Sequence, residues 1–232
     1  GDVVSFDKQI QNHKTIVSKL NLMMNESAQA HLRKCLYTIN IGSNDYMNNY
    51  FMPEHYKSSQ SSNPDQFATS LIDQYRDKLK ILYQSGATKV AVFGLGRVGC
   101  TLGQVMRNRP KTLCVDKMND AASLFNSKLQ TLVAEMNHKF SNAKFTFINT
   151  QAIDIGPQQG ITVLDQPCCQ LREDFMCKES SPPCNNRNAH YFWDGYHPTE
   201  AVCKLVGNRA FKASNPVEAI PMDISSLVKF KL

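Results

Sequence analysis

Long apolar segments and long runs of like charge are both missing from this chain of 232 residues. No apolar run approaches the ~20 residues that a membrane-spanning helix needs, so we expect no integral membrane segment. The lysines and arginines are scattered rather than gathered in a block, and the net charge of +6 is modest. A solvated surface is therefore favoured over a basic face that binds nucleic acid or anionic wall polymers.

What is present is typical of one folded domain. Hydrophobic residues make up 42% of the chain, which is enough to fill a sizeable core. The length lies within the single-domain range, and neither an internal repeat nor a second domain is visible. We therefore expect residues 1–232 to form a single domain.

Helical and strand patterns alternate along the chain. Apolar residues at helical spacing predict helices from Phe6 to Leu22, from Pro64 to a stop at Gly86, from Val115 to Met136, and after Pro198. Runs of β-branched and aromatic residues predict strands at Leu36 to Ile41, Lys89 to Leu95 and Phe145 to Ile148. This alternation predicts an α/β fold with a parallel sheet.

The most informative motif places a carboxylate three residues before an imidazole, in Trp193-Asp194-Gly195-Tyr196-His197-Pro198-Thr199. A histidine is an effective general base near neutral pH. Asp194 could accept a hydrogen bond from one ring nitrogen of His197, which leaves the other nitrogen free to take a proton. Pro198 fits the first position of the helix that follows. By itself the motif is also explained by a surface loop with a capping aspartate.

A second motif follows the first predicted strand, in Gly42-Ser43-Asn44-Asp45-Tyr46. Gly42 permits a tight turn, and Asn44 would lie past the carboxyl end of a strand, where open α/β sheets bind ligands. Its amide could donate to a developing oxyanion. An ordinary Asn/Asp turn is the competing interpretation.

Eight cysteines indicate disulfides and hence a secretory route. Cys100 and Cys114 could close a short loop, and Cys168 and Cys169 should each bond to one of Cys177 and Cys184. A zinc site is the alternative. However, the spacings from Cys169 to Cys177 and from Cys177 to Cys184 are longer than those of zinc knuckles. Cys35 and Cys203 lie in strand and helix patterns and should be free core residues. Asn25-Glu26-Ser27 is an acceptor sequence for an N-glycan.

These segments together resemble the plant-type GDSL esterase/lipase family of SGNH hydrolases. The resemblance rests on Gly42 to Phe51, Gly86 to Gly96, Val98 to Cys100, Asn119, Phe125 to Leu129, the four later cysteines and Phe192 to Thr199. It implies a flavodoxin-like three-layer α/β/α sandwich with a parallel sheet. It also implies a secreted carboxylic-ester hydrolase acting on acyl esters or lipids, with no cofactor and no metal.

The family resemblance assigns roles residue by residue. Asp194 and His197 become catalytic, with His197 taking the proton of a serine and Asp194 holding His197. Asn44 becomes an oxyanion donor, and Gly42 and Asp45 become substrate-binding residues. Thr101 and Leu102 depart from the family, which usually has proline nearby, and this affects the predicted shape of the pocket.

Two blocks of the family pattern are not found: the G-D-S block with the nucleophile and the next block, whose glycine supplies an oxyanion N–H. Gly1-Asp2-Val3 matches the G-D-S block only at its glycine and aspartate. Ser5 fits a helix cap better than a nucleophile. We therefore expect an N-terminally incomplete domain without the first two strands, with an unpaired edge at Leu36 to Ile41. Such a chain should be inactive by itself. A non-catalytic lipid- or glycan-binding paralogue and a zinc-stabilised interaction module are the alternative functions.

Overall fold

The computed structural model describes residues 3–24 and 27–231. The predicted glycan acceptor at Asn25-Glu26 and the Gly1-Asp2 pair lie outside these residues. The helices are α1 Phe6–Met23, α2 Ala28–Leu32, α3 Ser43–Asp45, α4 Ser58–Ser61, α5 Pro64–Gln84, α6 Leu102–Asn108, α7 Asp116–Lys139, α8 Glu200–Phe211 and α9 Ile224–Lys229. The strands are β1 Leu36–Ile39, β2 Lys89–Phe93, β3 Lys144–Ile148, β4 Val163–Pro167, β5 His190–Phe192 and β6 Ala219–Ile220.

The central sheet has the strand order β1-β2-β3-β6, and its first three strands are parallel. These three are the strands that the sequence predicts, with ends shifted by one or two residues. β6 pairs with β3 in the antiparallel direction through only two residues. A strand of this length shows no alternation of apolar and polar residues, so the sequence does not predict it. β4 and β5 form a separate two-stranded sheet.

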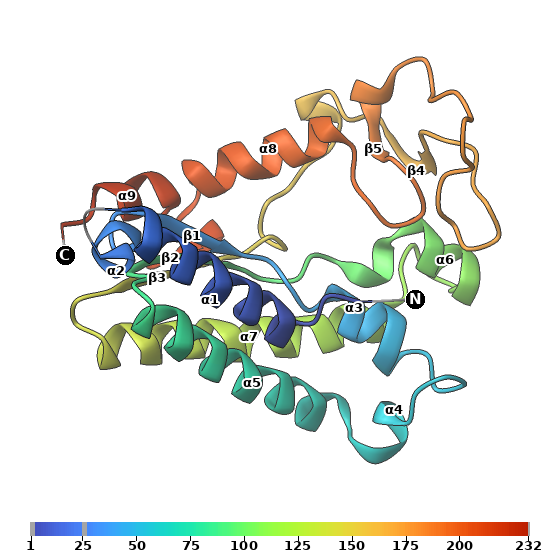
Figure 1. The fold of residues 1–232 in the computed structure, drawn as a ribbon. Coiled ribbons are helices and arrows are strands. Elements are labelled where there is room, and N and C mark those ends of the chain that lie inside the picture. Colours follow the sequence, from blue (N-terminus) through green and yellow to red (C-terminus); the bar gives the residue numbers. More distant parts are fainter. Residues whose placement is uncertain (1–2, 25–26, 232) are drawn as a thin grey trace.

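Helices cover both faces of the sheet, as the α/β prediction requires (Figure 1). On one face, α5 and α7 pack on Val90, Val92, Phe145 and Phe147 in the larger core. On the other face, Ala91 and Ile148 pack with residues of α8, β6 and α9. The arrangement is a mostly parallel α/β/α structure, which agrees with the predicted fold class.

Local sequence explains where the long helices begin. Asn63 and Gln66 form a reciprocal capping box at the start of α5, with Pro64 in the first turn. Ser5 caps α1, because its hydroxyl accepts a hydrogen bond from the N–H of Lys8 at 3.2 Å. The predicted structural role of Ser5 is therefore confirmed.

The start of α8 corrects one prediction. Pro198 is not the first helical residue, because Thr199 is the N-cap and its hydroxyl accepts from the N–H of Val202. Pro198 instead forms an isolated antiparallel bridge with Phe192. The hydroxyl of a threonine cap accepts a hydrogen bond from a free backbone N–H at the helix start. Proline has no N–H and makes no such hydrogen bond.

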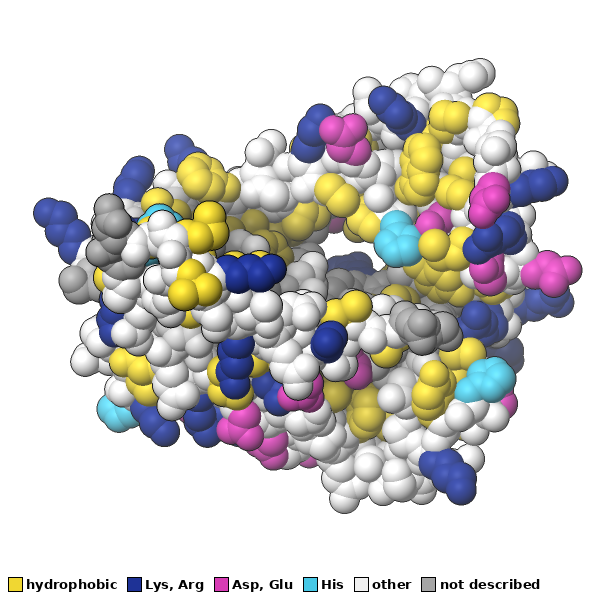
Figure 2. All heavy atoms as spheres, viewed as in Figure 1, with side chains coloured by type: hydrophobic (Ala, Val, Ile, Leu, Met, Phe, Trp, Pro, Cys, Tyr) yellow, Lys and Arg dark blue, Asp and Glu magenta, His cyan; other side chains and the backbone are white. Residues whose placement is uncertain are grey.

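β1 lies at one edge of the central sheet. Within the described part of the chain its ladder partner is β2, and the predicted unpaired edge is present. Leu36 at the start of this strand is 38% exposed. On the face seen in Figure 2, the molecule is hollowed between the part that carries α8 and β5 and the part that carries α1 and α3. No helix among the described residues is long and apolar enough to cross a bilayer.

The cysteines pair within the limits that the sequence sets. The disulfides are Cys100–Cys114, Cys168–Cys184 and Cys169–Cys177, and Cys35 and Cys203 are free. The prediction that the two free cysteines belong to the core is wrong for Cys203, which is exposed on α8, and Cys35 is only partly buried just before β1. A ring nitrogen of His190 lies within 4.8 Å of the sulfurs of Cys168 and Cys184, but the two sulfurs are bonded to each other and offer no thiolate.

Candidate active site

The loop between β5 and α8 holds Asp194 and His197 in direct contact. Nδ1 of His197 lies 2.8 Å from Oδ2 and 3.1 Å from Oδ1 of Asp194. Because an ionised carboxylate only accepts, the Nδ1–H of His197 donates to it, and Nε2 is left to accept a proton. The hydrogen bond expected from the sequence is therefore present.

The carboxylate of Asp194 also organises the backbone of its own loop. Its Oδ1 accepts hydrogen bonds from the N–H of Tyr196 at 2.7 Å and of His197 at 2.8 Å. Asp194 is only 3% exposed, whereas the side chain of His197 is 63% exposed. A buried acid thus holds an imidazole that faces open space, which suits a group that exchanges protons with a ligand.

The cysteine-rich segment and α6 brace this loop from outside. Gly195 donates from its N–H to the carbonyl of Phe175 at 2.8 Å and accepts from the N–H of Gly103 at 2.7 Å. A Cβ on Gly195 would lie 2.6 Å from Cβ of Phe175, and a Cβ on Gly103 would lie 2.5 Å from the ring of Tyr196. At Gly195 the close atoms include the backbone carbonyl of Phe175, so glycine is required there, whereas a side chain at Gly103 would displace the ring of Tyr196.

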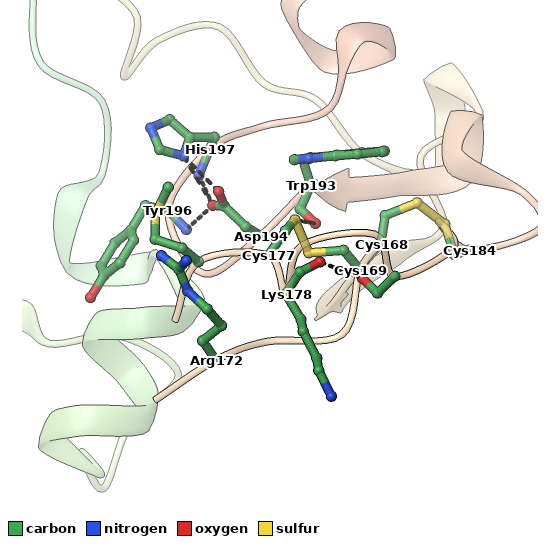
Figure 3. The surroundings of a disulfide bond; sticks show 12 residues. Cys168, Cys169, Arg172, Cys177, Lys178, Cys184, Trp193, Asp194, Tyr196 and His197 are labelled. Atoms are coloured by element: carbon green, nitrogen blue, oxygen red, sulfur yellow. Dashed lines mark hydrogen bonds and ion pairs between the residues drawn. A yellow bond between two sulfur atoms is a disulfide. The ribbon is translucent and has the colours of Figure 1, made fainter. Parts of the chain in front are cut away.

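Two disulfides lie directly beside the Asp194 loop (Figure 3). The N–H of Cys168 donates to the carbonyls of Phe192 and Trp193, each at 3.0 Å. Cys168 bonds to Cys184, and the adjacent Cys169 bonds to Cys177. The cross-linked segment therefore supports the loop that carries the acid and the imidazole.

The second predicted group follows β1. Gly42 adopts φ +125°, and a Cβ there would lie 3.2 Å from Leu95, so the sharp turn into α3 requires glycine. Asn44 is exposed on α3, and its Oδ1 accepts from Nδ2 of Asn48 at 3.0 Å. This contact orients the Asn44 amide and leaves its own N–H groups available to another acceptor. Asp45 is partly buried, and burial raises the pKa of its carboxyl group.

The structure brings together Asp194 and His197, and it groups Gly42, Asn44 and Asp45 separately. Among the described residues, no hydrogen bond joins Asn44 to Asp194 or His197. The two groups nevertheless lie at the same end of the molecule, toward which the parallel strands run (Figure 1). This is the end where ligands bind in open α/β sheets.

Sequence reasoning missed several supporting residues. Asn48 stands four residues after Asn44, and helical spacing was a signal that could have identified it. Gly103 and Phe175 contact the Asp194 loop from distant parts of the chain, and no local pattern marks them. Arg107 also reaches the loop, since its guanidinium donates to the hydroxyl of Tyr196 at 3.3 Å.

Comparison with known proteins shows the family to which the chain belongs. The family of GDSL-like Lipase/Acylhydrolase proteins matches residues 4–210. The chain belongs to this family.

Its relatives include three proteins of Arabidopsis thaliana, each named GDSL esterase/lipase. At1g29670 is 38% identical over 99% of this chain and 66% of its own length. At4g18970 is 37% identical over 99% of this chain and 66% of its own length, and At4g30140 is 40% identical over 98% of this chain and 64% of its own length. The chain thus spans slightly less than two thirds of these relatives.

Proposed function

We propose that this protein is a carboxylic-ester hydrolase in which His197 is the general base and Asp194 orients it. The contact between the buried carboxylate and the exposed imidazole carries this proposal. Membership of the GDSL family supports it, because relatives carry the name esterase/lipase. Asn44 acts as an oxyanion donor, while Gly42 shapes the turn and Asp45 contacts the substrate.

The proposed reaction has two acyl transfers. A serine hydroxyl attacks the ester carbonyl and its proton passes to Nε2 of His197, while Asn44 donates to the oxyanion. The C–O bond to the alcohol breaks, and His197 returns the proton to the departing oxygen. Water then attacks the acyl-enzyme in the same way and releases the carboxylic acid and the free serine.

The nucleophile is the element of this mechanism that the described residues do not provide. Within the described ranges, no hydroxyl is hydrogen-bonded to His197, and Ser5 caps α1 instead. We therefore propose that the serine comes from sequence outside this chain and that the 232-residue chain is inactive by itself. Three disulfides support action in a secretory or extracellular compartment. Acyl esters or lipids are the proposed substrates.

The test compares the 232-residue chain with the longest product that its gene encodes. We expect p-nitrophenyl acetate turnover only in the longer protein, with loss on His197→Ala and inhibition by an organophosphonate. His190→Ala is a control histidine change in the neighbouring strand. Turnover that survives both His197→Ala and Asp194→Ala would refute the proposed roles. Ligand binding without turnover in the longer protein would instead favour a non-catalytic paralogue.

A further inference from the structure

A three-residue turn in the cysteine-rich segment holds Phe175 in an unusual backbone conformation. The N–H of Phe175 donates to the carbonyl of Arg172 at 3.0 Å, and the N–H of Arg172 donates to the carbonyl of Met176 at 2.8 Å. These bonds close a hairpin loop in which the third residue adopts the left-handed conformation, a place that glycine usually takes. Phe175 stands there with φ +63°, so a side chain is present where it costs backbone energy.

Two features outside the strained residue hold the turn in this shape. At its base, the Cys169–Cys177 disulfide joins the two arms of the hairpin. At its tip, the carboxylate of Asp174 pairs with the guanidinium of Arg172 at 2.7 Å and accepts from the N–H of Met176 at 3.1 Å. Strained residues persist only where their surroundings determine the conformation, and they are concentrated at functional sites. The strain in this turn therefore points to a function.

Phe175 contacts the loop that carries His197 with both its backbone and its ring. Its carbonyl accepts from the N–H of Gly195 at 2.8 Å, and its ring meets the ring of Tyr196 edge-on, with the centroids 6.3 Å apart. The guanidinium of Arg107 lies 5.8 Å from the centroid of the Phe175 ring and donates to the hydroxyl of Tyr196 at 3.3 Å. The half-buried Phe175 ring is thus packed between α6 and the loop.

Gly195 and Tyr196 are the two residues that separate Asp194 from His197 in the sequence. Phe175 therefore contacts the whole of the link between the buried acid and the exposed imidazole. A contact at this link can change the direction of the imidazole without touching the ring itself, because the link carries the backbone that the Asp194 carboxylate also holds.

Comparison with a glycine at position 175 shows what the strained backbone provides. A glycine could keep the left-handed turn and the hydrogen bond from Gly195 without the conformational cost. It would, however, present no ring to Tyr196 and no aromatic face to Arg107. The strained phenylalanine therefore differs from the unstrained alternative in one respect, which is the ring that it packs against the residue next to His197.

We propose that Phe175 is a positioning residue, and that its ring, held by a strained turn, keeps His197 in the orientation that ester hydrolysis requires. Phe175 acts through Gly195 and Tyr196 rather than on the reacting atoms. The effect on turnover rests on the proposed function, but the effect on the imidazole does not. Because a displacement of about 1 Å can lower an enzymatic rate about a hundredfold, a loop that loses this support should be a poor carrier of the base.

Phe175→Ala and Phe175→Gly separate the strain from the positioning in the 232-residue chain. Both remove the ring, but only glycine relieves the left-handed backbone, so Phe175→Gly should unfold at a higher urea concentration than Phe175→Ala. Nitrogen-15 NMR of the imidazole, assigned with His197→Ala, should show the neutral ring protonated on Nδ1 in the unchanged chain. Both variants should move these signals equally toward a mixture of tautomers. Unchanged signals, or a movement that follows the urea midpoint, would overturn the proposal.

Ser180→Gly is the matched control for relief of strain. Ser180 is exposed, lies in the same cysteine-rich segment and has φ +58°. Its replacement by glycine should raise the urea midpoint and leave the His197 signals where they are. Phe175→Tyr keeps an aromatic ring in place and should retain the signals of the unchanged chain. Movement of the His197 signals by Ser180→Gly as large as that by Phe175→Gly would overturn the specific role of the ring.

Turnover is measured in the longest product that the gene encodes. Phe175→Gly should lower kcat for p-nitrophenyl acetate at least about tenfold and change KM by less than about twofold, while Phe175→Tyr should retain turnover. An unchanged kcat, or an equal fall in Ser180→Gly, would overturn the positioning role. Absence of turnover in the unchanged longer protein, with His197 signals that still depend on Phe175, would refute the proposed hydrolysis and leave the positioning of the imidazole standing.

Discussion

A single carboxylate, that of Asp194, holds both the backbone and the ring of His197. Oδ1 accepts from the N–H of His197 at 2.8 Å, and Oδ2 lies 2.8 Å from Nδ1 of its imidazole. The ring orientation is therefore coupled to the loop conformation, and the loop cannot change without changing the direction of Nε2.

We expect Asp194→Ala to lower the free energy of unfolding by about 1–3 kcal/mol, because it leaves two partly buried backbone N–H groups without their acceptor. Asp194→Asn keeps one oxygen acceptor and should cost less. Chemical denaturation of the 232-residue chain measures both. Asp165→Asn, an exposed change on β4, is the control. Equal stability of the alanine variant and the unchanged chain would contradict the proposed organising role of this carboxylate.

Two Gly→Ala changes are expected to alter the stability of the chain in opposite directions. Gly195→Ala should destabilise the chain by about 1–3 kcal/mol, because its Cβ would meet Phe175. Gly207→Ala should stabilise it by about 0.5–1 kcal/mol, because Gly207 lies within α8 and, apart from its chain neighbours and the backbone of its own helix, none of the described residues has an atom within 4 Å of the added methyl group. Thermal unfolding distinguishes the two, and a stable Gly195→Ala variant would show that the contact with Phe175 can relax.

The ion pair between Arg209 and Glu218 should make stability depend on pH. Glu218 is 1% exposed, and Arg209 lowers the pKa of its carboxyl below the ordinary value of 4.5. A lowered folded pKa contributes stability above about pH 4.5, and this contribution disappears as the pH falls through the folded pKa. Arg209→Met should therefore cost about 3–5 kcal/mol at pH 7 and less at pH 3.

Arg76→Met is the matched control for this ion pair. Arg76 is 30% exposed and Arg209 is 29% exposed, but the acidic partners of Arg76 are themselves 51% to 63% exposed. Its loss should cost about 0–1 kcal/mol at either pH. An equal effect of the two arginine changes would contradict the importance of burial at Glu218.

Removal of the Cys168–Cys184 disulfide should cost about 3 kcal/mol on the chain-entropy account of its loop. The change should also reach Trp193, because the N–H of Cys168 donates to its carbonyl. Cys168→Ser with Cys184→Ser should shift the tryptophan emission as well as the unfolding midpoint. Cys203→Ser changes an exposed free thiol and should alter neither. An unchanged emission spectrum would contradict the prediction that this disulfide supports the loop that carries Trp193 and His197.

Ser5→Ala should cost about 1 kcal/mol through loss of the α1 cap and should not affect ester hydrolysis in the longer protein. Denaturation and p-nitrophenyl acetate turnover are measured on the same variant. Ser127→Ala changes an exposed serine in the interior of α7, away from the helix caps, and serves as the control. Loss of turnover specific to Ser5→Ala would identify Ser5 as the nucleophile and refute its structural assignment.

The sequence by itself determined the features that depend on near neighbours. The three parallel strands and the long helices follow from apolar periodicity, and the Asp194–His197 hydrogen bond joins residues only three positions apart. Adjacent cysteines rarely bond to each other, so we expect Cys168 and Cys169 each to pair with one of Cys177 and Cys184, which leaves two arrangements. Such features are local because the chain geometry of a few residues is enough to produce them.

Tertiary structure decided the contacts between distant segments. It selected Cys168–Cys184 over Cys168–Cys177, added β6 through a two-residue pairing, and placed Gly103 and Phe175 against Gly195. It also brought Arg187 to the side of Trp193 and Glu200, where a small cavity forms. These contacts depend on the packing of several elements at once, and no periodicity within a single segment encodes them.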